Sequence, residues 1–327
     1  MTRVLSGIQP TGRKHLGNYI GAIRHYVTDQ DAHEAFYCIV DLHAITVPYD
    51  PAALRENTLD TAATLLAAGL DPARCALFVQ SHLHEHAEAA WLLGAVATMG
   101  ELNRMTQLKD KGAGRDSVAA ALYTYPVLMT ADILLYKADR VPVGDDQRQH
   151  LELARNVAQR FNSRFGDTLV VPEAAIPRTG GRVMDLQVPT DKMSTTGGTP
   201  LGTVLVTDPP EAIARKIRSA VTDSGREVAR GEGKEGIANL IEIMAVATDR
   251  SPEQVEDAYD GAGYGQFKAD VADAVIEYLR PVRERYEELV RDPGQLSATL
   301  TAGAEQARAV SSVTLAAIKQ AMGFVAE

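Results

Sequence analysis

Short apolar runs and longer helical patterns alternate along the first eighty residues of the chain. Residues 35–40 (AFYCIV) and 76–79 (ALFV) are continuous apolar runs of strand length, and residues 3–5 begin a third. Such runs are typical of strands buried on both faces of a parallel sheet. Between them, residues 50–68 have a helical pattern that opens with an aspartate and a proline, a common helix start. The order β-α-β-α-β predicts an α/β fold with a Rossmann-type doubly wound parallel sheet.

The pattern changes near residue 200, after which helical periodicity dominates. We expect helices at residues 210–220, 236–247, 251–260, 266–290 and 295–322. The stretch 191–200, rich in glycine and hydroxyl groups, is typical of a domain boundary. A length of 327 residues also fits about two domains. We therefore predict a Rossmann domain at 1–198 and an all-helical domain at 199–327.

Charge and cysteine content narrow the class of protein. The net charge of −10 argues against sequence-blind binding of nucleic acid, although a local basic surface remains possible. Cys38 and Cys75 form no C-x-x-C pair, which argues against a disulfide framework or a cysteine-based metal site. The first residues lack the pattern of a signal peptide, and no apolar run approaches the length of a membrane span. We expect a cytoplasmic protein with no membrane partner.

Residues 7–18 (GIQPTGRKHLGN) form a strand-turn-helix pattern with the features of a phosphate-binding loop. Such a turn presents backbone N–H groups and the positive end of a helix dipole to an anion. Gly17 lets a phosphate or a flat ring approach the backbone closely, and His15 supplies a nearby donor. An ordinary βα loop is the alternative, and spacing alone does not decide between the two.

Polar groups also follow two other expected strands. Residues 41–46 (DLHAIT) come directly after the buried run 35–40, and residues 141–150 (VPVGDDQRQH) form a second strand-turn-helix pattern. The carboxyl ends of strands are where open α/β sheets bind ligands. Two acids and an amide in the second segment suit ribose hydroxyls or an amino group. His150 beside these acids could suggest a metal site, but no paired histidine spacing supports one, so we expect none.

A carboxylate lies among apolar groups on one face of a predicted helix. Tyr125, Met129, Asp132 and Tyr136 fall at helical spacing. A buried acid needs a hydrogen-bond donor. Asp132 is therefore either a structural residue bonded to its own chain or a group that receives an N–H or O–H from a ligand.

Two further segments each admit two interpretations. The alanine- and leucine-rich pattern at 84–105 contains the only tryptophan, Trp91, and predicts a helix that is either central or covered by a partner, so it is a candidate subunit interface. Residues 109–115 (KDKGAGR) are either a mobile basic loop or a solvated turn.

Two short motifs, at residues 15–18 and 192–196, resemble the signature motifs of a known enzyme class and occur in the same order. Residues 15–18 (HLGN) resemble the HIGH signature of class I aminoacyl-tRNA synthetases, and residues 192–196 (KMSTT) resemble their KMSKS loop. Within that class the whole chain is most similar to the tryptophanyl-tRNA synthetase family, through the phrases SGIQPTG at 6–12, DLHAIT at 41–46, TADILLY at 130–136, VPVGDDQRQH at 141–150 and AVTDS at 220–224.

The resemblance implies a tryptophan–tRNA ligase that joins L-tryptophan to ATP, with Mg²⁺, and then esterifies the terminal adenosine of tRNA(Trp). It further implies a homodimer and no DNA partner. The implied catalytic residues are His15, Asn18, Lys111 and Lys192. The implied ATP-binding residues are Gln9, Pro10, Thr11, Gly17, Asn18, Gly144, Asp145, Asp146, Val183, Lys192, Met193, Ser194, Thr195 and Thr196. The implied tryptophan-binding residues are Leu5, Gly7, His43, Tyr125, Met129, Asp132, Val141, Val143 and Gln147, with Asp132 accepting the indole N–H.

The chain departs from the family pattern at Thr195, where a second lysine is usual. Losing one charge-assisted hydrogen bond costs about 1.5–3 kcal/mol, which weakens activation without abolishing it. For tRNA contact, Arg215, Lys216 and Arg218 form a candidate basic stripe, and a solvated helix face is the alternative. Two rival functions remain: a related adenylyl-transferring enzyme that acts on a small molecule, and a non-catalytic paralogue retained for RNA or partner binding.

Overall fold

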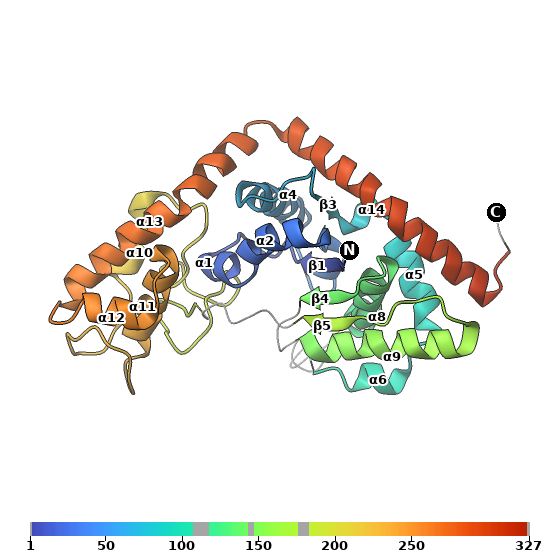
Figure 1. The fold of residues 1–327 in the computed structure, drawn as a ribbon, viewed down its shortest axis with the longest axis horizontal. Coiled ribbons are helices and arrows are strands. Elements are labelled where there is room, and N and C mark those ends of the chain that lie inside the picture. The colour runs from blue at the N-terminus through green and yellow to red at the C-terminus, as the bar shows by residue number, and fades with distance from the viewer. Residues whose placement is uncertain (1, 107–117, 143–146, 176–182, 326–327) are drawn as a thin grey trace.

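A parallel sheet lies at the centre of the molecule (Figure 1). The computed structural model describes residues 2–106, 118–142, 147–175 and 183–325. In that part of the chain, the sheet has five strands in the order β3-β2-β1-β4-β5, and every pairing is parallel. The strands are β1 (Arg3–Ile8), β2 (Glu34–Ile39), β3 (Cys75–Val79), β4 (Arg140–Pro142) and β5 (Glu173–Ala175). The strand order reverses between β1 and β4, the position at which such sheets bind ligands.

The helices that connect these strands cover both faces of the sheet. They are α1 (Leu16–Asn18), η1 (Tyr19–Ile23), α2 (Arg24–Ala32), α3 (Asp41–Ala44), α4 (Pro51–Ala67), η2 (Gln80–His82), α5 (Glu85–Gly94), α6 (Met99–Asn103), α8 (Ala120–Leu135) and α9 (Arg148–Phe165). Helix α4 begins as predicted, because the Asp50 carboxylate accepts a hydrogen bond from the Ala53 N–H at 2.7 Å.

Alternate residues of β2 point into two different cores. Phe36 and Cys38 belong to a buried cluster with Leu134 of α8, whereas Tyr37 and Ile39 belong to a second cluster with α4. Side chains alternate along a strand, so a strand covered on both faces must be apolar at every position. The continuous apolar run therefore has the physical cause that the sequence pattern predicts, and the α/β fold class is confirmed.

A group of helices with its own core follows the sheet in sequence and lies to one side of it (Figure 1). It contains α10 (Pro210–Arg218), α11 (Glu235–Thr248), α12 (Pro252–Ala258) and α13 (Tyr264–Leu289). Ile213, Leu240 and Phe267 are fully buried in this core. Ser251 and Gln254 cap α12 reciprocally. The helical character of the carboxyl-terminal region is confirmed.

The last helix returns to the sheet. Helix α14 (Pro293–Met322) packs across β3. Its Leu300 belongs to the buried cluster that contains Tyr37, and its Ala307 belongs to the cluster that contains Phe36. Gly303 makes this approach possible, because a Cβ at that position would collide with the backbone carbonyl of Leu77. A boundary at residue 198 stays a prediction: α13 packs on α10 and α11 of the helical part and also on α4, and α14 packs on the sheet part (Figure 1).

The predicted helix at 84–105 is interrupted in the structure. Thr98 and Glu101 form a capping box that starts α6 as a separate helix after α5. Trp91 on α5 is 83% exposed, and Met99 on α6 is 65% exposed. The segment therefore forms two helices with an exposed apolar surface around Trp91 and Met99, and its role as a subunit interface stays a prediction. Among the described residues, no helix combines the length and apolar character needed to cross a membrane.

Candidate active site

A cavity of about 990 Å³ opens between β1 and β4, where the strand order reverses. Its wall is built by β1, residues of η1 and α2, His43 of α3, one face of α8, and β4. This wall combines apolar side chains with a few convergent polar groups, the usual character of a small-molecule site. The geometry therefore brings together segments that are more than a hundred residues apart.

The cavity collects most of the predicted amino-acid-binding residues. Its described wall includes Leu5, Gly7, His43, Tyr125, Met129, Asp132, Val141 and Gln147. From the predicted nucleotide and catalytic sets it includes Gln9, Asn18 and Lys192. The remaining described members lie outside this wall: Pro10, Thr11, His15, Gly17, Val183, Met193, Ser194, Thr195 and Thr196. Predictions for Lys111, Val143, Gly144, Asp145 and Asp146 lie outside the described residues.

His15 and Asn18 are locked together at the start of α1. The His15 Nδ1 accepts from the Asn18 N–H at 3.3 Å, and the Asn18 Oδ1 accepts from the His15 N–H at 3.1 Å. Burial, with a smaller effect of the charge on Lys14, lowers the pKa of His15 to about 4. The ring is therefore neutral near pH 7, and its proton is on Nε2. A Cβ on Gly17 would lie 3.1 Å from this ring, so Gly17 makes room for the imidazole.

The predicted phosphate loop, residues 7–18, and the segment around Lys192 contact each other. Gly12 has φ +71°, and a Cβ there would lie 2.7 Å from the Thr195 Oγ1. The Leu16 N–H donates to the carbonyl of Val204 at 2.8 Å, which ties the loop to the chain that follows Thr195. The segments that resemble the HIGH and KMSKS motifs are thus in contact in the folded chain.

A buried lysine braces the phosphate loop from within. Lys14 is 5% exposed, and its Nζ donates to the carbonyl oxygens of Gln9 at 2.7 Å and Gly12 at 3.4 Å. Burial lowers the pKa of Lys14 to about 8, and the carboxylate of Asp60 opposes this change. Sequence reasoning missed this role, because a lysine in such a loop is expected to face a phosphate.

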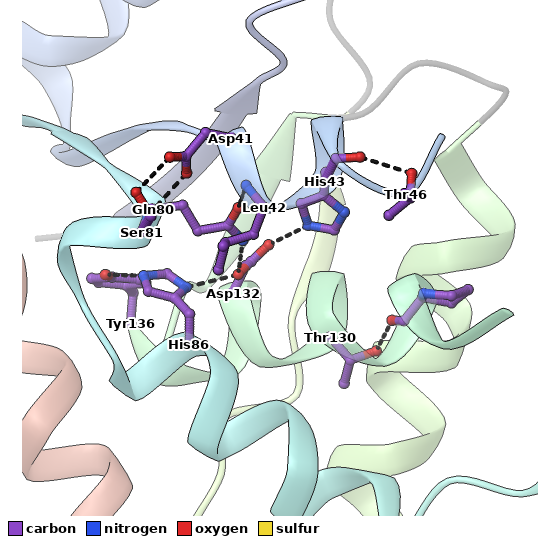
Figure 2. A network of polar contacts seen from close by, with 11 residues as sticks. Asp41, Leu42, His43, Thr46, Gln80, Ser81, His86, Thr130, Asp132 and Tyr136 are labelled. Carbon is purple, nitrogen blue, oxygen red and sulfur yellow. Dashed lines mark hydrogen bonds and ion pairs between the residues drawn. The ribbon is translucent and has the colours of Figure 1, made fainter. Parts of the chain in front are cut away.

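Asp132 lies at the centre of a buried polar network (Figure 2). Its Oδ1 accepts from the Gln80 Nε2 and the His86 Nδ1, both at 2.7 Å, and its Oδ2 accepts from the His43 Nε2 at 2.8 Å. The His86 Nε2 lies 2.9 Å from the Tyr136 hydroxyl. Burial alone would raise the pKa of Asp132, but the hydrogen bonds from His43 and His86 hold the pKa well below its usual range. Asp132 is therefore a carboxylate.

The sequence left open whether Asp132 is bonded to its own chain or accepts a hydrogen bond from a ligand, and the network shows the first of these. Asp132 has donors from its own chain, and it also lines the cavity. Gln80 and His86 were not predicted. Gln80 directly follows the apolar strand β3, so the rule that identified residues 41–46 could have found it. No local signal identifies His86, which lies on α5.

Another histidine contacts a cavity residue of α8. The Tyr125 hydroxyl lies 2.7 Å from the His150 Nε2, and burial raises the pKa of Tyr125 to about 12. His150 is therefore a hydrogen-bond partner of a cavity residue. In the described part of the chain, no group of three or more histidine, cysteine or acidic side chains is placed to hold a metal.

One of the three candidate tRNA-contacting cations on α10 is not available at the surface. Lys216 is buried, and its Nζ donates to the Asp208 carboxylate at 2.6 Å. Arg215 and Arg218 are exposed. The predicted stripe is therefore wrong at Lys216, because the amphipathic helix turns this side chain toward the helical core.

Comparison with known proteins identifies the family of the chain. The model of the family "tRNA synthetases class I (W and Y)" matches residues 1–280, which include the whole sheet. Tryptophan–tRNA ligase 2 of Streptomyces avermitilis is 51% identical, covering 99% of this chain and 97% of that protein. Tryptophan–tRNA ligase of Caldanaerobacter subterraneus is 48% identical, covering 99% of both chains.

Solved structures of tryptophanyl-tRNA synthetases have the same fold as this chain. Tryptophanyl-tRNA synthetase of Mycoplasma pneumoniae superimposes with a TM-score of 0.89 at 36% identity, covering 99% of this chain and 98% of that one. The Campylobacter jejuni enzyme, complexed with ADP and tryptophan, gives 0.88 at 34% identity, covering 99% of this chain and 100% of that one. The chain therefore belongs to the class I aminoacyl-tRNA synthetases, in the family of bacterial-type tryptophan–tRNA ligases.

Proposed function

We propose that the chain activates L-tryptophan with ATP, giving tryptophanyl-adenylate and pyrophosphate, and then transfers tryptophan to the 3′-terminal adenosine of tRNA(Trp). The observation that carries the amino-acid choice is the buried, ionised Asp132 beside Met129 on the cavity wall. An indole offers one N–H within a large apolar ring, and α8 places the acceptor Asp132 next to the apolar side chains of Met129 and Ile133 on the cavity wall. A site built to bond such a group rejects analogues that lack it by about 10⁴–10⁵.

The proposed activation step needs positioning and charge stabilisation but no protein nucleophile. A carboxylate oxygen of tryptophan attacks the α-phosphorus, and the bond from that phosphorus to pyrophosphate breaks. Because the His15 Nδ1 accepts from Asn18, its Nε2–H is left to donate to a phosphate oxygen. Lys192, with Lys111, is proposed to carry the charge of the departing pyrophosphate. Mg²⁺ is expected to enter with ATP, since this ion is usually bound largely through substrate phosphates.

The partners follow from the same assignment. We propose that tRNA(Trp) contacts the exposed Arg215 and Arg218, that two copies associate through the surface around Trp91 and Met99, and that the enzyme works in the cytoplasm. The exposure of the two apolar side chains supports the dimer.

Pyrophosphate exchange with each amino acid, followed by charging of tRNA, tests the proposal. We expect exchange that depends on tryptophan and on ATP. Asp132→Asn should lower tryptophan-dependent exchange about ten- to a hundredfold, and the exposed Asp167→Asn serves as the control. Exchange without charging would favour a small-molecule adenylyl transferase. Exchange with tyrosine alone would refute the choice of amino acid, and no exchange at all would favour a non-catalytic paralogue.

A further inference from the structure

Two fully buried residues hold Asp132 from behind the cavity. Gln80 and His86 are both 0% exposed, and in the described wall of the cavity Asp132 and His43 are present but neither of these two is. Both donate to the same oxygen, Oδ1. They therefore act on the carboxylate from outside the described cavity wall.

The orientation of each donor is set by a second bond. A carboxylate only accepts, so the ring nitrogen of His86 that faces it, Nδ1, carries a proton. In the neutral ring the Nε2 then accepts from the Tyr136 hydroxyl, which selects this tautomer. The Gln80 Oε1 accepts from the Leu42 N–H at 3.2 Å, so its amide nitrogen must face Asp132 (Figure 2).

The two oxygens of Asp132 are unequally used. A carboxylate has about four acceptor positions. Oδ1 accepts two hydrogen bonds, and Oδ2 accepts one, from His43, within the part of the chain that the structure describes. Oδ2 lies on the side of His43, which lines the cavity. The fourth acceptor position therefore belongs to Oδ2, at the cavity.

We propose that Gln80 and His86 are positioning residues that fix the rotation of Asp132, so that Oδ2 presents its remaining acceptor position to the indole N–H. This inference rests on the proposed function and deepens it: selectivity for an indole depends on two residues that never touch the substrate. Without them the carboxylate can rotate toward other donors, and the N–H loses its aligned acceptor.

A matched pair of substitutions at one position tests the proposal. The amide nitrogen of His86→Asn falls near the original Nδ1 and can still donate to Asp132. That of His86→Gln falls near the original Nε2 and cannot. The kcat/KM for pyrophosphate exchange is measured with tryptophan and with 3-benzothienylalanine, in which sulfur replaces the N–H. We expect His86→Gln to lose about ten- to a hundredfold with tryptophan and little with the sulfur analogue, and His86→Asn to stay within a few-fold of wild type.

The outcomes separate positioning from general support of the fold. Equal losses with both amino acids, or equal behaviour of the two variants at unchanged melting temperature, would overturn the proposal. If the His86 variants do not fold, Gln80→Leu carries the same comparison between the two amino acids, because it removes the second donor to Oδ1. Wild-type enzyme without tryptophan-dependent exchange would instead refute the proposed function, so the two failures are distinguishable.

Discussion

Removing the charge of Lys14 should change how stability depends on pH. In the folded protein the pKa of Lys14 is about 8, compared with an ordinary value of 10.5. Between these two values the unfolded chain binds the proton more tightly than the folded chain does. The free energy of unfolding contributed by Lys14 therefore rises as pH increases from about 8 to about 10.5, by about 3 kcal/mol in all.

Lys14→Met tests this, because methionine has a similar length and no charge. Urea unfolding is measured for both proteins at intervals from pH 7 to pH 10.5. The wild type should gain stability relative to the variant across this range, since all other titrating groups are shared. The neutral amine can still donate to Gln9 and Gly12. A constant difference between the two proteins would refute the burial argument.

Lys14→Met should also weaken the binding of ATP. Lys14 holds the carbonyl of Gln9, and Gln9 lines the cavity. With the loop no longer braced, we expect the KM for ATP in pyrophosphate exchange to rise about tenfold, while the KM for tryptophan changes little. A change confined to the KM for tryptophan would contradict the proposal that the loop braced by Lys14 binds ATP.

Three other perturbations have clear expected outcomes. Lys192→Ala should nearly abolish pyrophosphate exchange, whereas Thr195→Ala should cost only a few-fold, because a hydroxyl there replaces the usual charge; near wild-type exchange by Lys192→Ala would contradict the phosphate role. Trp91→Glu should shift sedimentation toward the monomer, and the fluorescence of Trp91, the only tryptophan, should move to shorter wavelength as wild-type protein associates. Gly303→Ala should lower the free energy of unfolding by about 1–3 kcal/mol, since a methyl group would meet the Leu77 carbonyl, whereas Gly265→Ala on α13 meets open space and serves as the control.

The sheet could be predicted because its causes are local. The run at 35–40 is apolar throughout because β2 faces a core on each side, and this is visible without any partner. The start of α12 is equally local, since Ser251 and Gln254 satisfy each other within one turn. Patterns of this kind give the fold class and many helix starts.

The polar network could be predicted only in part, because its partners are distant in sequence. Asp132 bonds to residues 46, 52 and 89 positions away, so no local spacing identifies His86, and only its position after β3 marks Gln80. The burial of Lys14 and of Lys216 was not predicted, for a related reason. Each is polar in sequence, but tertiary packing buries it against a carbonyl or a carboxylate. Burial of a charged group is decided by the whole fold.

The phosphate loop belongs to both parts of the molecule. Leu16 and Ile20, at the start of the helix that follows the loop, are buried in the core of the helical part. Arg13 lies 3.7 Å from Asp60 of α4, and the same carboxylate oxygen accepts from the Tyr286 hydroxyl of α13 at 2.7 Å. A displacement of the helical part relative to the sheet must therefore break these contacts or carry the loop with it. Since Gly12 also touches Thr195, the spacing between the two nucleotide motifs depends on the same contacts.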